Sequence, residues 1–305
     1  MRRSIYLLLA IGALASQALG QLSVQVKPEK DTFLVYESIP LSVLIRNYSG
    51  RTIELSAEAD KPWLSFVVAD ESGSMMAAIA APRADEPLLI APGQTVSRKI
   101  DLLPLYDIRA RGGYRVQARV IGAGSSAISP PVALTVINGR EIWSETVGLP
   151  AKEGALDEYR TYALLARRSE KQDMLHASVR DDQHQTVYGV VSLGGFITLG
   201  DPEAHVDKEG HLHVLYQVGP RSFAYAHIDP DARVVDRAVY SDLLSKPRLI
   251  VTEGAVAVRG GEKTYPRSER IMSADDLKPS APPQAKPKRH WWWPFGRSSV
   301  AQSPK

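Results

Sequence analysis

Short stretches in which apolar and polar residues alternate constrain the fold of this chain more than any other feature. Residues 22–26 and 39–45 alternate with a period of two, which is the pattern of a β-strand with one buried face. Turn-forming residues at 70–73 and 91–94 separate such stretches. Regularly spaced short strands of this kind predict an all-β fold, with a β-sandwich over residues 21–137. The further strands are predicted at 52–55, 63–68, 75–79, 95–102, 114–121 and 132–137.

Three segments of this first region resemble strands of bacterial immunoglobulin-like domains. The segment YESIPLSVLIRN at 36–47 is similar to their early strands. APGQT at 91–95, followed by an alternating strand, is similar to their late hairpin, and GYRVQA at 113–118 is similar to their glycine-tyrosine-arginine-valine strand. The resemblance implies an immunoglobulin-like β-sandwich. It implies no particular activity, because that architecture hosts many functions.

A different pattern predicts a second β-rich domain over residues 138–265. Segments 202–215 and 247–258 align around a turn glycine and start 45 residues apart, and 175–179 begins a weaker third copy. They resemble the blade repeats of secreted β-propellers, which implies partial propeller-like repeats. A propeller needs at least about four blades, so a propeller fragment, a propeller completed by oligomerisation and an ordinary small β-domain all stay open. Within this domain, residues 156–166 predict a short helix.

The first twenty residues have the organisation of a secretory signal peptide. A basic start is followed by apolar residues 5–15 and by small residues at Ala18 and Gly20. This order predicts a signal peptide over residues 1–20, cleaved before Gln21. A signal anchor is the alternative, but the apolar run is shorter than the roughly 20 residues that span a bilayer. The chain has no cysteine, which favours an exported bacterial protein, periplasmic or extracellular, held together by burial alone.

The last forty residues, 266–305, are predicted to form a disordered tail. Residues 280–289 are dominated by Pro, Lys and Ala, the composition of an extended linker. Tryptophans then stand beside cations, an arrangement that suits a membrane interface or an anionic polymer; folding back onto the chain's own domain is the alternative. The formal net charge of +3 is too small to predict nucleic-acid binding. The candidate anchor consists of Trp291, Trp292, Trp293, Phe295, Lys288 and Arg289.

Six of the seven histidines cluster in the second predicted domain. His211 and His213 stand two apart, so a strand would present both on one face. With His205 or His227 as a third ligand, such a pair can hold zinc. The alternation around Val214, however, places these histidines on the polar face of a half-buried strand. We therefore expect them to face solvent and to hold no metal or other cofactor, and His205, His211 and His213 are only weak metal candidates.

Catalytic motifs are not evident in the sequence. The acidic pairs at 181–182 and at Asp229 and Asp231 stand in segments that indicate turns, and no nucleophile elbow, phosphate loop or dinucleotide fingerprint is present. The leading interpretation is an exported, non-catalytic binding or structural accessory protein of the cell envelope or extracellular space. A propeller-type glycan hydrolase or its accessory subunit and a sandwich-type protease inhibitor are the alternatives. The expected partner is an envelope protein, a polysaccharide or an anionic membrane surface, and not a nucleic acid.

Overall fold

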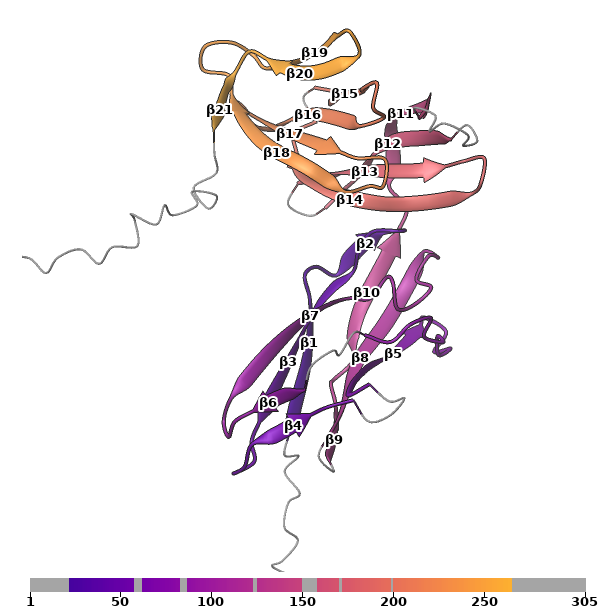
Figure 1. Ribbon diagram of the computed structural model, residues 1–305, viewed down its shortest axis with the longest axis vertical. Coiled ribbons are helices and arrows are strands. Elements are labelled where there is room, and N and C mark those ends of the chain that lie inside the picture. The colour runs from indigo at the N-terminus through magenta and orange to yellow at the C-terminus, as the bar shows by residue number, and fades with distance from the viewer. Residues whose placement is uncertain are drawn as a thin grey trace, which may run out of the picture. The chain divides into compact units, whose positions relative to one another are not determined.

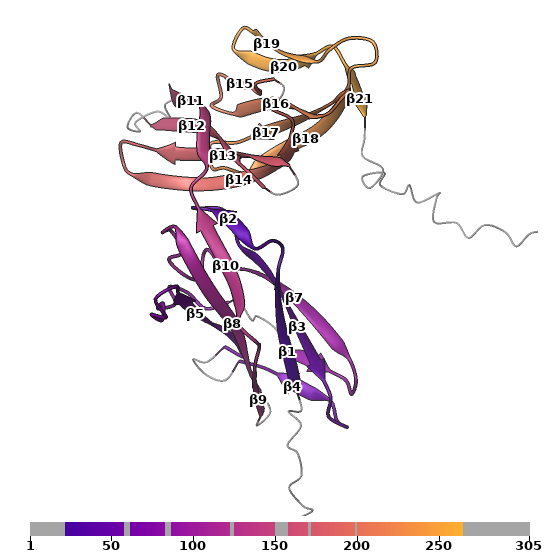
Figure 2. The same cartoon turned by 180° about the vertical axis from the view of Figure 1, so that it is seen from behind.

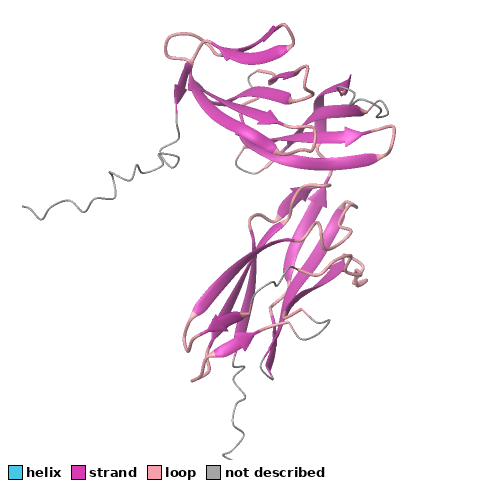
Figure 3. Cartoon of the chain, viewed as in Figure 1, coloured by secondary structure: helices cyan, strands magenta, loops and turns pink. Residues whose placement is uncertain are grey.

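The computed structural model describes residues 22–57, 62–82, 87–122, 125–149, 158–169, 172–198 and 200–264 (Figure 1). These residues form strands, turns and loops without any helix, as Figure 3 shows, so the predicted all-β class is confirmed. It follows that no described residue belongs to a helix able to cross a membrane. The predicted signal peptide and the predicted C-terminal tail lie outside the described residues.

The N-terminal region, residues 22–137, places two larger sheets around one apolar core. The first sheet has the order β1 (Leu22–Pro28), β3 (Pro40–Asn47), β7 (Thr95–Asp101). The second has the order β2 (Thr32–Leu34), β10 (Val132–Ile137), β8 (Gly112–Gly122), β5 (Leu64–Asp70), with β9 (Ser125–Ile128) on β8. A short pair joins β4 (Ile53–Leu55) to β6 (Leu88–Ile90). The pairs are antiparallel, except that β2 runs parallel to β10.

The alternation of the sequence explains how these strands build the core. In β1, Leu22, Val24 and Val26 are buried, while the residues between them are half-buried or exposed. β3 and β8 show the same alternation. The buried residues of both sheets form one apolar cluster, which stabilises the region through the area of apolar surface removed from water.

The predicted strand at 75–79 is wrong. These residues make only isolated pairs, Met75 with Ala69 and Ala78 with Tyr106. A turn after β5, in which the Asp70 carboxylate accepts the N–H of Ser74 at 3.0 Å, sends the chain to the surface. There it forms single pairs instead of a continuous ladder, and Met75 remains 69% exposed.

The C-terminal region, residues 140–264, consists of two antiparallel meanders and a hairpin (Figure 2). The first meander runs β11 (Arg140–Gly148), β12 (Tyr159–Arg167), β13 (Asp173–Asp181), β14 (Thr186–Phe196). The second runs β15 (Glu203–Val206), β16 (Leu212–Gly219), β17 (Ser222–Ile228), β18 (Val234–Ser241), with β21 (Glu262–Thr264) beside β18. The hairpin pairs β19 (Arg248–Thr252) with β20 (Ala255–Arg259).

The two best-aligned repeat segments form corresponding hairpins. β15 turns into β16 near Gly210, and β19 turns into β20 near Gly254, with φ values of 84° and 80° at these glycines. Both glycines therefore occupy the left-handed region, which costs glycine little. The two turns also contact each other, because the Lys208 N–H donates to the Gly254 carbonyl at 2.9 Å.

The predicted helix at 156–166 is wrong. Its described residues belong to β12 (Tyr159–Arg167), which pairs with both β11 and β13. Residues 160–164 are buried on both faces of the sheet. A strand that is buried on both faces does not alternate between apolar and polar residues. Its periodicity therefore does not distinguish it from a buried helix.

A buried polar contact joins the two regions. Glu37 and His176 are both almost fully buried, with Glu37 Oε1 3.2 Å from His176 Nε2. Lys30 Nζ lies 2.5 Å from the same carboxylate oxygen, and the Leu34 N–H donates to the other oxygen at 2.8 Å. The carboxylate is thus compensated by the Lys30 side chain and one backbone donor, with the His176 ring beside it.

Candidate functional site

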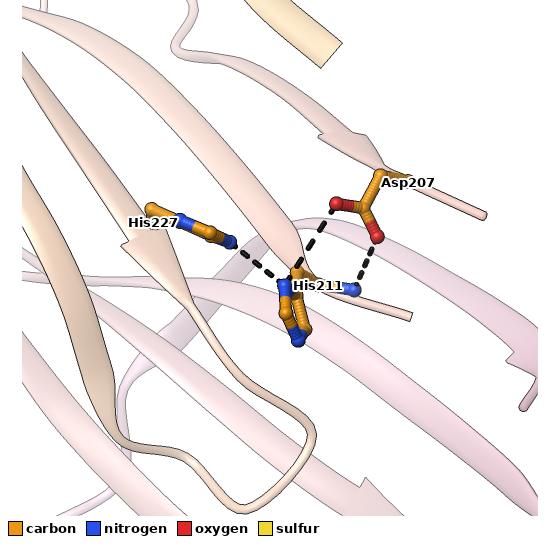
Figure 4. A group of neighbouring side chains, drawn as sticks. All are labelled: Asp207, His211 and His227. Atoms are coloured by element: carbon orange, nitrogen blue, oxygen red, sulfur yellow. Dashed lines mark hydrogen bonds and ion pairs between the residues drawn. The ribbon is translucent and has the colours of Figure 1, made fainter. Parts of the chain in front are cut away.

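A cluster of polar side chains is built on the turn between β15 and β16. Asp207 opens this turn, and its Oδ1 accepts the backbone N–H groups of Glu209 at 3.0 Å and His211 at 2.8 Å. A carboxylate that bonds its own following backbone is a common turn device. Since Oδ1 is held in this way, the other oxygen, Oδ2, faces the histidines of β16 and β17 (Figure 4).

Three histidines gather beside this carboxylate, two of them in neighbouring strands and His211 directly before β16. His213 in β16 lies directly opposite His227 in β17, and His211 precedes His213 by two residues on the same face. His227 Nε2 lies 2.9 Å from His211 Nδ1, and His211 Nδ1 lies 3.9 Å from Asp207 Oδ2 (Figure 4). One ligand atom from each of Asp207, His211 and His227 falls within 4.8 Å of the other two. We call Asp207, His211, His213 and His227 the histidine cluster.

His213 is the buried member of the histidine cluster, 5% exposed. Its Nε2 lies 2.9 Å from Asp207 Oδ2, and its Nδ1 lies 2.7 Å from the Tyr225 hydroxyl. An ionised carboxylate only accepts, so Nε2 donates, and in the neutral ring Nδ1 accepts from Tyr225. This tautomer is assigned from the hydrogen-bond partners. The ring also stacks on His227, with centroids 4.4 Å apart.

The environment sets the protonation of the cluster. Burial raises the pKa of Asp207, but the hydrogen bonds from His213 and from the His211 backbone lower it more, so the pKa lies below its ordinary value. Burial, followed by the charges of His213 and His211, lowers the pKa of His227. Burial raises the pKa of Tyr225 to about 12. At neutral pH the site therefore combines a carboxylate, a neutral imidazole at His227 and an intact phenol.

The prediction that the β16 histidines face solvent is wrong for His213. β16 is covered on both faces, because residues 212–216 are all buried. The face carrying His213 and Leu215 packs against a separate small cluster of apolar side chains that includes Tyr225 and Leu249. His211 is half-buried, with a side chain 31% exposed, and His205 is exposed. His205 lies opposite His213 on β15 but is not part of the ligand group.

Asp207 and Tyr225 are the members of this site that sequence reasoning missed. Asp207 stands three residues before Gly210, and an Asp at that distance from a turn glycine is a turn signal that places its carboxylate beside the next strand. Tyr225 gives no such signal, because its contact with His213 depends on the pairing of β16 with β17.

The acidic pairs serve turns, as predicted. Asp181 accepts the N–H groups of Gln183 and His184 and lies 2.7 Å from the His184 ring. Asp229 accepts the N–H groups of Asp231 and Arg233. The predicted anchor lies outside the described residues: Trp291, Trp292, Trp293, Phe295, Lys288 and Arg289.

Comparison with known proteins gives little to place beside this geometry. No protein-family model matches the chain, and no curated protein is significantly similar to it. Among solved structures, the chain is similar to Spo0M, a sporulation control protein from Bacillus subtilis, with 13% sequence identity and a TM-score of 0.29. The match covers 54% of this chain and 81% of that one. A TM-score this low does not establish a shared fold, so no property of that protein is transferred here.

Proposed function

We propose that this chain is an exported, non-catalytic binding or structural accessory protein of the cell envelope or extracellular space. The observation that carries the non-catalytic part is the bonding of His213. A histidine acting as general base needs a ring nitrogen within reach of the substrate. Both nitrogens of His213 are instead engaged, by Asp207 and by Tyr225.

The His213–Asp207 pair has the form of the base and its orienting carboxylate in a catalytic triad. The position of a nucleophile is filled by the Tyr225 hydroxyl, which is buried and whose pKa of about 12 keeps it protonated. We expect no hydrolysis of chromogenic ester, peptide or glycoside substrates. Turnover by the purified chain that the His213→Phe variant abolishes would show that the protein is an enzyme and favour the glycan-hydrolase alternative.

The proposal includes a finer description of both regions. Two sheets around one core support an immunoglobulin-like sandwich for the N-terminal region. Two consecutive four-stranded antiparallel meanders support blade-like units in the C-terminal region. Scaffolds of both kinds carry function in their loops, as an accessory binding protein requires.

Export follows from the proposed signal peptide over residues 1–20. The test is the mass of the protein recovered from a bacterial host after secretion, which should correspond to a chain starting at Gln21. A full-length mass in the membrane fraction would favour a signal anchor.

We also propose that the aromatic and basic residues near the C-terminus attach the protein to an anionic surface. Indoles and cations bind such a surface through two additive terms, an apolar term and a salt-screened term. Co-sedimentation with anionic vesicles should be strong for the full chain and weak for a chain ending at Ala281. Replacing Trp291, Trp292 and Trp293 by alanine keeps every charge, so this variant should retain only the salt-sensitive part. Equal pelleting of all three chains would refute the anchor.

A further inference from the structure

We propose that Asp207, His211 and His227 form a binding site for one divalent transition-metal ion of the zinc class. The inference does not rest on the accessory role proposed above. It rests on three potential ligand atoms, Asp207 Oδ2 and His211 Nδ1 from the β15–β16 turn and His227 Nε2 from β17, that converge on one point (Figure 4).

The spacing of these atoms suits a tetrahedral metal. Zinc binds imidazole nitrogen and carboxylate oxygen at about 2.0–2.2 Å, which separates two ligands of a tetrahedron by roughly 3.4 Å. The His211–His227 nitrogen distance of 2.9 Å and the His211–Asp207 distance of 3.9 Å lie on either side of that value. Shifts of about half an ångström, less than a change of rotamer requires, would bring these two distances to the tetrahedral value, and the three ligand atoms already lie within 4.8 Å of one another.

The surroundings hold the ligands in place. Two backbone N–H groups fix Asp207 Oδ1, and His213 donates to Oδ2 while its own ring is held by Tyr225. Groups that orient a ligating carboxylate from outside the coordination sphere typically contribute about 10–100-fold to metal affinity. His213 is therefore assigned as a positioning residue and not as a ligand.

A metal ion can replace the hydrogen that lies between the His211 and His227 rings. His211 Nδ1 and His227 Nε2 lie 2.9 Å apart, a hydrogen-bond distance that requires a hydrogen on one of the two nitrogens. Metal binding needs a lone pair on both nitrogens, so in a neutral ring that hydrogen must move to the far nitrogen, and a protonated ring must release a proton. The half-buried His211 leaves a side open to solvent, where water can complete a three-ligand site.

The chemistry of the three proposed ligands also determines which metal ions the site should prefer. Two imidazoles and one carboxylate favour zinc, copper, nickel or iron. Calcium takes six to eight oxygen ligands and magnesium a near-octahedral oxygen shell, so neither should compete. The sequence-based expectation of no metal assumed solvent-facing histidines, whereas the proposed ligands His211 and His227 are both half-buried.

The test uses the untagged chain from Gln21 to Lys305, dialysed against Zn²⁺ alone and analysed for bound metal. About one ion per chain should be retained, and Zn²⁺ should raise the melting temperature, whereas Mg²⁺ should not. His211→Gln and His227→Gln should each weaken binding at least tenfold. His213→Phe should weaken it about 10–100-fold.

His205→Gln is the matched control, because His205 lies on the same face but outside the ligand group. It should bind Zn²⁺ as the unchanged chain does. Circular dichroism melts without metal separate lost binding from lost folding, and Asp207→Asn, which keeps the Oδ1 acceptor, offers a second way to remove a ligand. The site is refuted if the unchanged chain retains no zinc, or if His205→Gln loses as much as His211→Gln.

Discussion

The N-terminal region gathers its buried side chains into a single apolar cluster, whereas the C-terminal region divides its core into two and buries more polar groups between its strands. Among the described residues, the buried polar side chains of the first region are Glu37, Asn47 and Ser129. Those of the second are Arg160, Thr161, His176, Ser178, Asp181 and His213.

Asn47 of the first region and His213 of the second differ in the kind of partner they have. Asn47 satisfies its amide with the carbonyls of Arg51 and Ile90, so it closes a turn of the backbone. His213 bonds to two other side chains. A buried polar group that bonds to the backbone stabilises the local fold. In a network of buried side chains, each member fixes the position of the others, and removing one leaves a buried polar group unpaired, which costs stability. We therefore expect substitutions in the first region to lower stability mainly by removing buried apolar volume. In the second region they should lower stability mainly by leaving buried polar groups without their hydrogen-bond partners.

The largest expected effect comes from emptying the apolar cluster of the N-terminal region. Phe33 is fully buried there. Phe33→Ala should lower the free energy of unfolding by about 3–5 kcal/mol, because it removes apolar contact and leaves a cavity. Urea denaturation followed by circular dichroism measures it, with Phe33→Leu as a milder control. An effect no larger than the roughly 1 kcal/mol of an average substitution would contradict a volume-dominated core.

An intermediate effect should follow from removing the polar centre of the C-terminal region. His213→Phe keeps a ring but removes the hydrogen bond to Asp207 Oδ2 and the partner of the Tyr225 hydroxyl, so about 1–3 kcal/mol of stability should be lost. Tyr225→Phe should cost less in the His213→Phe background than in the unchanged chain, since the bond is already gone. A double-mutant cycle by urea denaturation tests this. Additive losses would show that the two side chains are independent.

A smaller effect should appear in the acid stability of the contact between the regions. Burial raises the pKa of Glu37, but contact with His176, then with Lys30 and the Leu34 N–H, lowers it more, so the pKa lies below the ordinary 4.5. The unfolded chain then binds more protons than the folded one, so this stabilisation is present above pH 4.5 and is lost as pH falls through the folded pKa.

The measurement is the difference in unfolding free energy between the unchanged chain and Glu37→Gln as a function of pH. Other carboxylates with lowered pKa, Asp207 among them, contribute equally to both chains and cancel. The difference should shrink as the pH falls below 4.5. A difference that stays constant from neutral to acidic pH would show that the charge of Glu37 contributes nothing.

The smallest effects are expected at the surface of both regions. Arg109 pairs with Asp107 in the first region and Arg221 with Asp242 in the second, each at 3.0 Å. Alanine at either arginine should change stability by less than about 1 kcal/mol, as is usual for exposed pairs. Thermal melts at low and high salt check this. A large loss at Arg221 alone would mean that the polar character of the second region extends to its surface.

Sequence reasoning succeeded where strands are buried on one face and failed where they are buried on both. β1 and β3 alternate visibly because only one face meets the core. β12 has buried residues on both faces, so its sequence predicts a helix. β16 is also buried on both faces, which is why the alternation of its sequence did not predict that His213 is buried. β2 and β6 are each three residues long, too short to show any period.

Only part of the candidate site could be predicted from the sequence, for a related reason. Spacing alone brings His211 and His213 to one face, and these were identified. The approach of Asp207 and the alignment of His227 depend on how β15, β16 and β17 pair, and a register is set by contacts across the sheet.

Tyr225 belongs to two neighbourhoods at once. Its hydroxyl holds His213 beside the proposed metal ligands, while its ring packs with Leu249 of the β19–β20 hairpin. A side chain shared in this way makes the two neighbourhoods thermodynamically linked, and linkage is reciprocal. An ion that steadies the histidines would slow the opening of the hairpin, seen as slower amide hydrogen exchange in β19. By the same factor, a partner protein that binds the hairpin would raise the affinity of the histidine cluster for the ion. Binding of the ion and binding of the partner would therefore be coupled through Tyr225.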